Sequence, residues 1–154
     1  MKDLTLIIPA KNEKESLPKV LNELKEFNLN ITIILEKSDI ETIKAISNYK
    51  CEIIYQVNKG YGDALILGLN SVQTKYFCIF NADGSFNPNE LNQMINKIEN
   101  DKNDIVFASR YEENCSSEDD TIITYLGNFI FTKLGNIFFK LNISDILYTF
   151  VLGK

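Results

Sequence analysis

The 154-residue chain contains no histidine and no tryptophan, and it has only three cysteines. Without histidine, neither a Ser-His-Asp nor a Cys-His arrangement can be built, so acid–base chemistry would fall to Asp, Glu, Lys, Tyr or a metal-bound group. Cys51, Cys78 and Cys115 are odd in number and show no CxxC spacing. The usual structural zinc sites are therefore excluded, and a reducing, cytoplasmic compartment is expected.

Several other features are missing from the sequence. No apolar run is long enough to span a bilayer, and the first residues lead straight into a short strand instead of a signal peptide. The formal net charge of −5 argues against a nucleic-acid partner, because a phosphate backbone requires a basic surface. Neither a GxGxxG segment after the first strand nor a GxxxxGK(S/T) loop occurs, which excludes the common dinucleotide- and ATP-binding loops.

Apolar residues alternate between two spacings over the first 108 residues. Short apolar runs predict strands, and apolar residues three and four apart predict the helices between them. The expected strands are residues 4–8, 31–35, 52–56, 75–80 and 104–108, and the expected helices are residues 14–27, 39–47, 61–72 and 88–100. Strands that alternate with helices predict an α/β fold with a mostly parallel sheet. In a doubly wound order, the first and fourth strands are neighbours.

The run from Tyr76 to Ser85 is typical of a buried strand that ends on a carboxylate, that of Asp83. If the first and fourth strands are neighbours, the loop of residues 9–13 and the segment 81–83 face one crevice at the sheet edge. A carboxylate there can hold a hard divalent cation. The alternative is that Asp83 only opens a turn or caps the following helix.

Four segments of the sequence contain recognisable motifs. Residues 7–13 read IIPAKNE, residues 58–64 read NKGYGDA, residues 81–83 read NAD and residues 104–111 read DIVFASRY. In this order and spacing they resemble the motifs of the family 2 glycosyltransferases, particularly the polyprenyl- and dolichyl-phosphate sugar transferases. The resemblance runs from residue 4 to about 111 and continues weakly to 145. It implies the GT-A fold, a Rossmann-like three-layer α/β/α arrangement around a mostly parallel sheet.

The resemblance also implies roles on the donor side. Asp83, assisted by Asn81, would hold Mg²⁺ or Mn²⁺ on the diphosphate of a UDP- or GDP-hexose. The residues expected to bind the nucleotide sugar are Pro9, Ala10, Asn12, Glu13, Glu36, Lys59, Gly60, Asn81 and Ala82. Some of them have a purely structural alternative: Glu13 could stabilise a helix start, and Lys59 could merely shape a turn. Gly60 lets the backbone approach a ligand or a neighbouring strand.

On the acceptor side, Arg110 matches an arginine that helps to hold the acceptor phosphate in polyprenyl-phosphate transferases. Its alternative is an ion pair with the acidic loop 112–120, which we expect to be solvated and mobile. Asp145 is an acceptor-side catalytic candidate, with a structural loop aspartate as the alternative. Residues 122–141 are rich in Phe, Ile and Leu. They predict either a helix buried on two sides by the core, which we favour, or an interfacial helix touching lipid.

Four departures from the family pattern bear on activity. Asn81 replaces the first aspartate of the D-x-D motif, and residues 35–38, LEKS, replace D-D-G-S, with Leu35 where the first aspartate often reads the base. Asp120 falls near a position where the polyprenyl-phosphate branch has an arginine. The segment 147–150, LYTF, lacks the usual G-F-R. Relatives continue past this point, so we expect a chain that is truncated at its C-terminal end or naturally short.

We therefore expect one domain over residues 1–154, with a nucleotide-sugar-binding core (1–111) and an acceptor-side loop and Phe-rich helix (112–154). The expected activity is metal-dependent, inverting transfer of a hexose to a polyprenyl phosphate or a saccharide, in the cytoplasm or at the inner face of a membrane. The alternative is a degenerate domain that keeps the fold and binds only a nucleotide or a partner.

Overall fold

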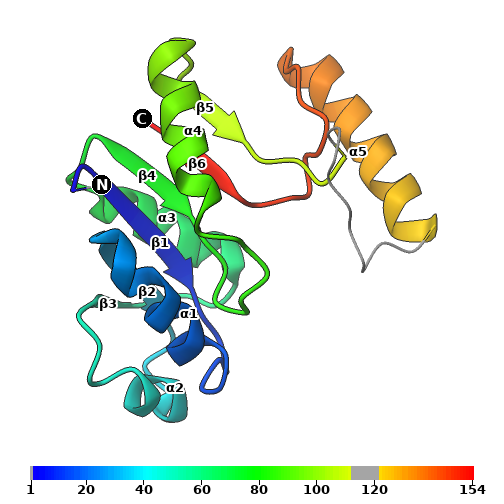
Figure 1. Ribbon diagram of the computed structural model, residues 1–154. Coiled ribbons are helices and arrows are strands. Elements are labelled where there is room, and N and C mark those ends of the chain that lie inside the picture. Colours follow the sequence, from blue (N-terminus) through cyan, green and yellow to red (C-terminus); the bar gives the residue numbers. More distant parts are fainter. Residues whose placement is uncertain (1, 112–121) are drawn as a thin grey trace.

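The computed structural model describes residues 2–111 and 122–154 (Figure 1). Its strands are β1 (Leu4–Pro9), β2 (Asn30–Leu35), β3 (Glu52–Tyr55), β4 (Tyr76–Ile79), β5 (Ile105–Phe107) and β6 (Val151–Gly153). Its helices are α1 (Leu17–Leu24), α2 (Ile40–Ala45), α3 (Tyr61–Ser71), α4 (Glu90–Asn100) and α5 (Ile122–Phe139), with a short 3₁₀ turn, η1 (Lys25–Phe27), after α1. The expected acidic loop 112–120, with Cys115 and Asp120, lies outside the described residues.

The sheet has the doubly wound order, in which the first and fourth strands are neighbours. Its six strands run β3-β2-β1-β4-β6-β5, and β1 pairs in parallel with both β2 and β4. The sequence did not indicate β6, a three-residue strand that inserts between β4 and β5 and runs antiparallel to both. Because β6 reverses direction, β5 runs parallel to β4 even though the two strands are not adjacent.

Helices cover both faces of the sheet, which confirms the three-layer prediction (Figure 1). Side chains of a strand alternate between the two faces. Leu6 of β1 therefore belongs to the larger core cluster under α1 and α4, whereas Ile7 belongs to the smaller cluster under α3. Gly68 lets α3 approach closely, because a Cβ there would collide with Ile7 and lie 2.9 Å from Ile34.

An aromatic cluster lies where the sheet meets the segment that leads into β6. Phe86 stacks on Phe150, with ring centroids 4.6 Å apart, and meets Phe80 and Tyr148 edge-on at 5.6 and 5.0 Å. Phe80, Phe86 and Phe150 are almost completely buried. We call residues 142–150 the return segment, since they carry the chain from α5 back to the sheet.

The prediction that favoured a core position for the Phe-rich helix is wrong. In Figure 1, α5 stands to one side of the sheet, and neither core cluster of the described residues includes any of its side chains. Instead, polar and small residues on one side of α5 hold the return segment. The exposed side carries an apolar stripe, formed by Ile123, Leu126, Ile130, Leu134, Ile137 and Phe138.

Hydrogen bonds explain why α5 turns this stripe outward. The side-chain oxygen of Asn128 accepts from the backbone N–H of Leu147 at 3.2 Å, and that of Thr132 accepts from Ile146 at 3.1 Å. Asn136 exchanges two hydrogen bonds with the backbone of Ile143. These polar positions lie four residues apart, on one side of the helix. Satisfying the backbone of the return segment therefore leaves the opposite, apolar side exposed. No helix in the described ranges is long and apolar enough to cross a membrane.

Candidate functional site

The predicted site residues follow strands that end at the same edge of the sheet. The segments after β1, β2, β3 and β4 all lie at the carboxyl ends of parallel strands. Arg110 follows β5, which runs in the same direction, and Asp145 precedes the antiparallel β6. The topology thus brings segments more than 130 residues apart to one edge, which is where open α/β sheets bind ligands.

Asn81 and Asp83 lie in a short loop after β4, and the Asp83 side chain is exposed rather than turned into the core. The backbone N–H of Ser85 donates to Asp83 Oδ1 at 2.9 Å, and Asn81 Nδ2 donates to Ser85 Oγ at 3.2 Å. The alternative role for Asp83 is met in part, since it does close a turn. It does not cap α4, whose N-cap residue is Asn89. Ala82 lies between them with its methyl group in the core.

The loop after β1 is tied to the start of α2. Lys11 pairs with Glu36 at 3.2 Å and Lys14 with Glu41 at 2.8 Å. The backbone N–H of Asn12 donates to Asp39 Oδ2 at 2.7 Å, with Asn12 in the left-handed region at φ 60°. Asparagine tolerates this conformation better than most residues. The loop is therefore held in one arrangement beside the end of β2.

Asp39 is the centre of this connection. Burial alone would raise its pKa, but hydrogen bonds from the backbone N–H of Asn12 and from the hydroxyl and N–H of Thr42 outweigh it and hold the pKa below 3.8. Thr42 is itself fully buried, and its hydroxyl accepts from the backbone N–H of Glu13 at 3.0 Å. The Glu13 carboxylate accepts from the hydroxyl of Ser16, the N-cap residue of α1, and Glu13 itself lies before the first turn of that helix.

The other residues predicted on the donor side differ in their exposure. Pro9 ends β1 at the sheet edge and is partly exposed. Ala10 is buried in the core cluster, and its backbone N–H donates to the carbonyl of Ile34 at 2.9 Å. Leu35 is fully buried, and the position where relatives often carry a base-reading aspartate is here part of the core.

The loop after β3 contains Lys59, which is exposed, and Gly60. Gly60 has φ 110°, a conformation that strains any residue with a Cβ. A Cβ at Gly60 would meet no atom within 4 Å, so the expected close approach to a neighbouring strand is not found. The loop is closed instead by Gln56, whose Nε2 donates to the Gly60 carbonyl at 2.9 Å.

Arg110 and Asp145 form a bidentate ion pair. Arg110 Nε and one terminal nitrogen donate to the two Asp145 oxygens at 2.9 and 3.2 Å. The carboxylate also accepts from the backbone N–H of Tyr148 at 3.1 Å and is completely buried, whereas the guanidinium side chain is 27% exposed. Within the described ranges, the predicted acceptor-side candidates therefore contact each other, a pairing that sequence reasoning did not foresee.

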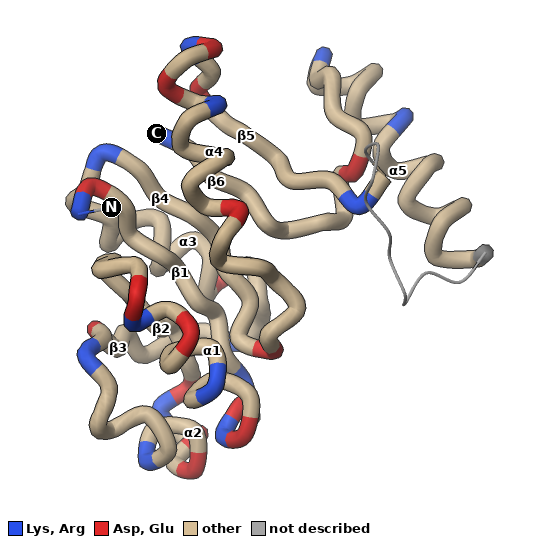
Figure 2. The backbone as a smooth tube through the Cα atoms, viewed as in Figure 1, with Lys and Arg blue, Asp and Glu red and all other residues tan. Residues whose placement is uncertain are grey.

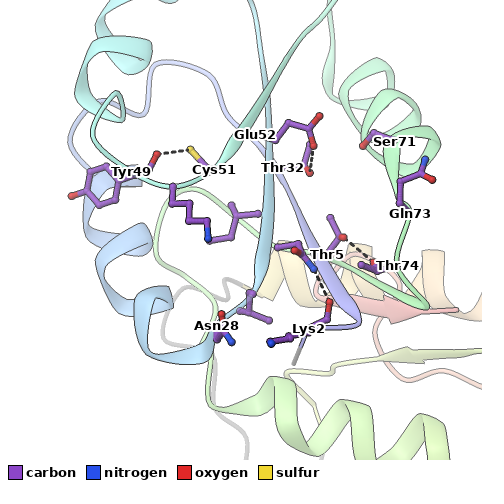
Figure 3. Close-up of a pocket in the computed structure, with 14 residues that line it drawn as sticks. Lys2, Thr5, Asn28, Thr32, Tyr49, Cys51, Glu52, Ser71, Gln73 and Thr74 are labelled. Carbon is purple, nitrogen blue, oxygen red and sulfur yellow. Dashed lines mark hydrogen bonds between the residues drawn. The ribbon is translucent and has the colours of Figure 1, made fainter.

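A cavity of about 690 Å³ lies at the opposite, amino end of the parallel strands (Figure 3). Its lining includes Thr5, Thr32 and Thr74, and the hydroxyls of Thr5 and Thr74 lie 2.8 Å apart. The candidate site is at the other edge of the sheet, so this cavity is not part of it.

Sequence reasoning missed Ser85, Asp39, Thr42 and Phe86 as residues that organise the site. Two of them could have been identified from their local sequence. Ser85 lies two residues after Asp83, and Asp39 stands where a helix N-cap is expected. Their contacts with other loops required the fold.

The described elements are arranged as in known GT-A proteins. Glucosyl-3-phosphoglycerate synthase from Mycobacterium tuberculosis, solved with UDP, is similar with a TM-score of 0.75 at 12% identity, over 98% of this chain and 56% of that chain. TarS from S. aureus is similar with a TM-score of 0.58 at 14% identity, over 79% of this chain and 39% of that chain. The protein therefore has the GT-A fold.

The family follows from the sequence as a whole. Residues 5–154 match the model of glycosyl transferase family 2, and the chain belongs to that family. The UDP-N-acetylglucosamine–dolichyl-phosphate N-acetylglucosaminyltransferase of Methanococcus voltae is 30% identical over 127 residues, which cover 68% of this chain and 51% of that protein. The low-salt glycan biosynthesis hexosyltransferase of Haloferax volcanii is 22% identical over 92% of this chain and 36% of that protein. The chain thus spans about half the length, or less, of these relatives.

Proposed function

We propose that the protein is a metal-dependent, inverting glycosyltransferase that moves a hexose from a nucleotide sugar to a polyprenyl phosphate. The observation that carries this proposal is the exposed Asp83 carboxylate, at the same sheet edge as the tied loops after β1 and β2. Similar proteins support the substrate classes: one relative is named for a UDP-sugar and dolichyl phosphate, and one solved neighbour holds Mn²⁺ and UDP.

The side chains of Asp83 and Asn81 could bind a divalent cation through one carboxylate and one amide oxygen. The described residues contain no group of three or more acidic, histidine or cysteine side chains that could enclose a metal. Mg²⁺ is commonly held by one or two carboxylates, with substrate phosphates and water completing its shell. Asp83 would hold the ion and the Asn81 oxygen would assist. When bound, the ion supplies charge neutralisation for the leaving diphosphate.

The chain's own residues would orient the donor and supply no strong base. The Lys11–Glu36 pair and the loop after β1 flank the nucleoside, with the loop after β3 alongside. A phosphate acceptor is already anionic, so one of its oxygens attacks the anomeric carbon as the bond to the diphosphate breaks. This chemistry is compatible with a chain that has no histidine.

Arg110 is the group we assign to the acceptor phosphate, because a guanidinium matches phosphate geometry. The buried Asp145 carboxylate holds its Nε edge in place, so we assign Asp145 to positioning Arg110 rather than to catalysis.

The apolar stripe of α5 favours a lipid-linked acceptor over a saccharide. The helix carries Lys133 and is followed by Lys140, but it has no acidic residue, as Figure 2 shows. An exposed apolar side flanked by lysines suits the surface of an anionic membrane. We therefore propose that the protein works at the cytoplasmic face of a membrane, with α5 in the interface.

Calorimetric titration with UDP and GDP, with and without Mn²⁺, tests the donor side. We expect wild type to bind one of these nucleotides in a metal-dependent manner. Asp83→Ala should abolish the metal-dependent part of the binding, because the carboxylate that we propose for the cation is lost. Asn81→Asp should tighten it, since a carboxylate binds a hard cation better than an amide. Asp101→Ala removes another exposed carboxylate, which lies beyond α4, and should change nothing.

Another outcome would favour the degenerate domain. Asn81 in place of a carboxylate and the buried Leu35 are the observations that support it. Binding that is absent, or equal with and without Mn²⁺ in wild type and Asp83→Ala, would count against the enzyme and for this second function.

A further inference from the structure

An asparagine on a cation raises a question of orientation that an aspartate does not. The two oxygens of a carboxylate are equivalent, whereas an amide presents an oxygen on one side and an NH₂ group on the other. Only the oxygen can coordinate a cation, and the NH₂ group would repel it. A site that uses Asn81 therefore needs something to fix which atom points inward.

Ser85 is placed to do this. Asn81 Nδ2 donates to Ser85 Oγ at 3.2 Å, which turns the NH₂ group towards the serine and leaves Oδ1 on the opposite side of the amide. The backbone N–H of Ser85 also donates to Asp83 Oδ1 at 2.9 Å. Within the described ranges, neither Asn81 Oδ1 nor Asp83 Oδ2 accepts a hydrogen bond. One residue thus occupies one polar atom of each candidate ligand and leaves the other available.

The position of Ser85 is itself well determined. The loop begins after Phe80 and ends at Phe86, and these two rings meet edge-on with centroids 5.6 Å apart. Phe86 is 3% exposed and stacks on Phe150 of the return segment at 4.6 Å. Gly84, with φ 85°, supplies the tight turn between them. The rings therefore anchor the residue next to Ser85, and the loop cannot shift without disrupting buried packing.

We propose that Ser85 is a positioning residue that orients the Asn81 amide so that its oxygen faces the divalent cation. This inference rests on the proposed function, because it assumes that Asn81 and Asp83 share a metal. It explains how the chain can keep a metal site with an amide in place of one carboxylate. It also makes Ser85 necessary only while residue 81 is an asparagine.

A double-mutant cycle tests this dependence through the Mn²⁺-dependent affinity for UDP, measured by calorimetry. Ser85→Ala keeps the backbone N–H to Asp83 and removes only the hydroxyl. In wild type we expect it to weaken the metal-dependent affinity about two- to tenfold, the usual worth of one hydrogen bond. In an Asn81→Asp background the same change should have less than about a twofold effect, since a carboxylate needs no orientation. Ser85→Thr keeps a hydroxyl, so in the asparagine background its Mn²⁺-dependent affinity for UDP should equal that of wild type.

A second readout needs no metal. In the free protein, the side-chain NH₂ resonances of Asn81 should show a hydrogen-bonded proton in NMR spectra, and Ser85→Ala should abolish that signature. Unchanged Asn81 resonances, or unchanged UDP affinity in Ser85→Ala, would overturn the inference. An equal loss of affinity in both backgrounds would also overturn it, because Ser85 would then act through the loop as a whole. Absence of any Mn²⁺-dependent binding in wild type would instead overturn the proposed function, and with it the metal role of Ser85.

Discussion

At the residue scale, Asp39 links the candidate site to stability. It is the N-cap of α2, its Oδ1 accepts from the backbone N–H of Thr42 at 3.3 Å, and its Oδ2 accepts from that of Asn12. Through these bonds the loop after β1 depends on a short helix that follows β2. One carboxylate therefore holds together two of the segments expected to bind the nucleoside.

The lowered pKa of Asp39 predicts a pH-dependent contribution to stability. Because the native pKa lies below the unfolded value near 3.8, the ionised form stabilises the fold above that pH, and the contribution is lost as the pH falls through the native pKa. Asp39→Ala should cost about 1 kcal/mol at pH 7, as expected for a lost N-cap. Asp39→Asn should cost less, because an amide still caps.

Urea unfolding followed by circular dichroism measures both effects. The difference between wild type and Asp39→Asn should be constant from pH 7 to about pH 5 and should shrink below about pH 4. A difference that is the same at all pH values would show that the charge of Asp39 does not contribute.

At the element scale, α5 is unusual because it packs through its polar side. Its packed residues include Asn128 and Thr132, which are both buried, while Ile130 and Ile137 are exposed. A helix in a globular protein normally does the reverse. Large exposed apolar patches commonly mark interaction surfaces.

Flotation of the protein with phosphatidylglycerol-containing vesicles tests the lipid contact. Wild type should float with the vesicles, and Ile137→Glu should remain in the lower fraction, because a charge would have to enter the apolar boundary. Ile66→Glu is the matched control: Ile66 lies on α3 and is 61% exposed, close to the 68% of Ile137, and its variant should float. If wild type does not float, or if Ile66→Glu fails as well, α5 is not a specific membrane contact.

At the scale of the whole molecule, the Arg110–Asp145 pair joins the two connections between the sheet and α5. The residues are 35 positions apart, and the guanidinium also lies 5.3 Å from the ring of Tyr148. Tyr148 in turn contacts Phe86 beside the Asp83 loop. The segments that we propose for the acceptor and for the donor thus share a continuous set of contacts.

Breaking this pair should destabilise the protein. Asp145→Asn leaves a guanidinium opposite a buried neutral amide, which should cost about 2 kcal/mol, less than the loss of a fully buried pair because Arg110 is partly solvated. Arg110→Lys keeps the charge but not the bidentate geometry, and it should cost less. Equilibrium unfolding in urea measures both. Wild-type stability of Asp145→Asn would mean that the pair does not hold the two connections together.

Much of the fold and part of the site could be predicted from local patterns. Periodicity located all five expected strands and their intervening helices within a few residues, because a strand or a helix must bury one face whatever its partners are. The alternation of elements predicted a mostly parallel sheet, whereas the β1–β4 pairing, which brings Asp83 and Pro9 to one edge, followed only if the order was doubly wound. Among the strands of the described residues, β6 was not predicted, because three residues are too few to show a period.

By itself, then, the sequence determined which segments form strands and helices and that they build a mostly parallel α/β core. The tertiary structure alone decided the outward direction of α5, the insertion of β6 and the pairing of Arg110 with Asp145. The physical reason is the separation in sequence of the groups that interact. Local preferences depend on neighbours a few residues away, whereas these three features depend on which distant backbone and charged groups must be satisfied together.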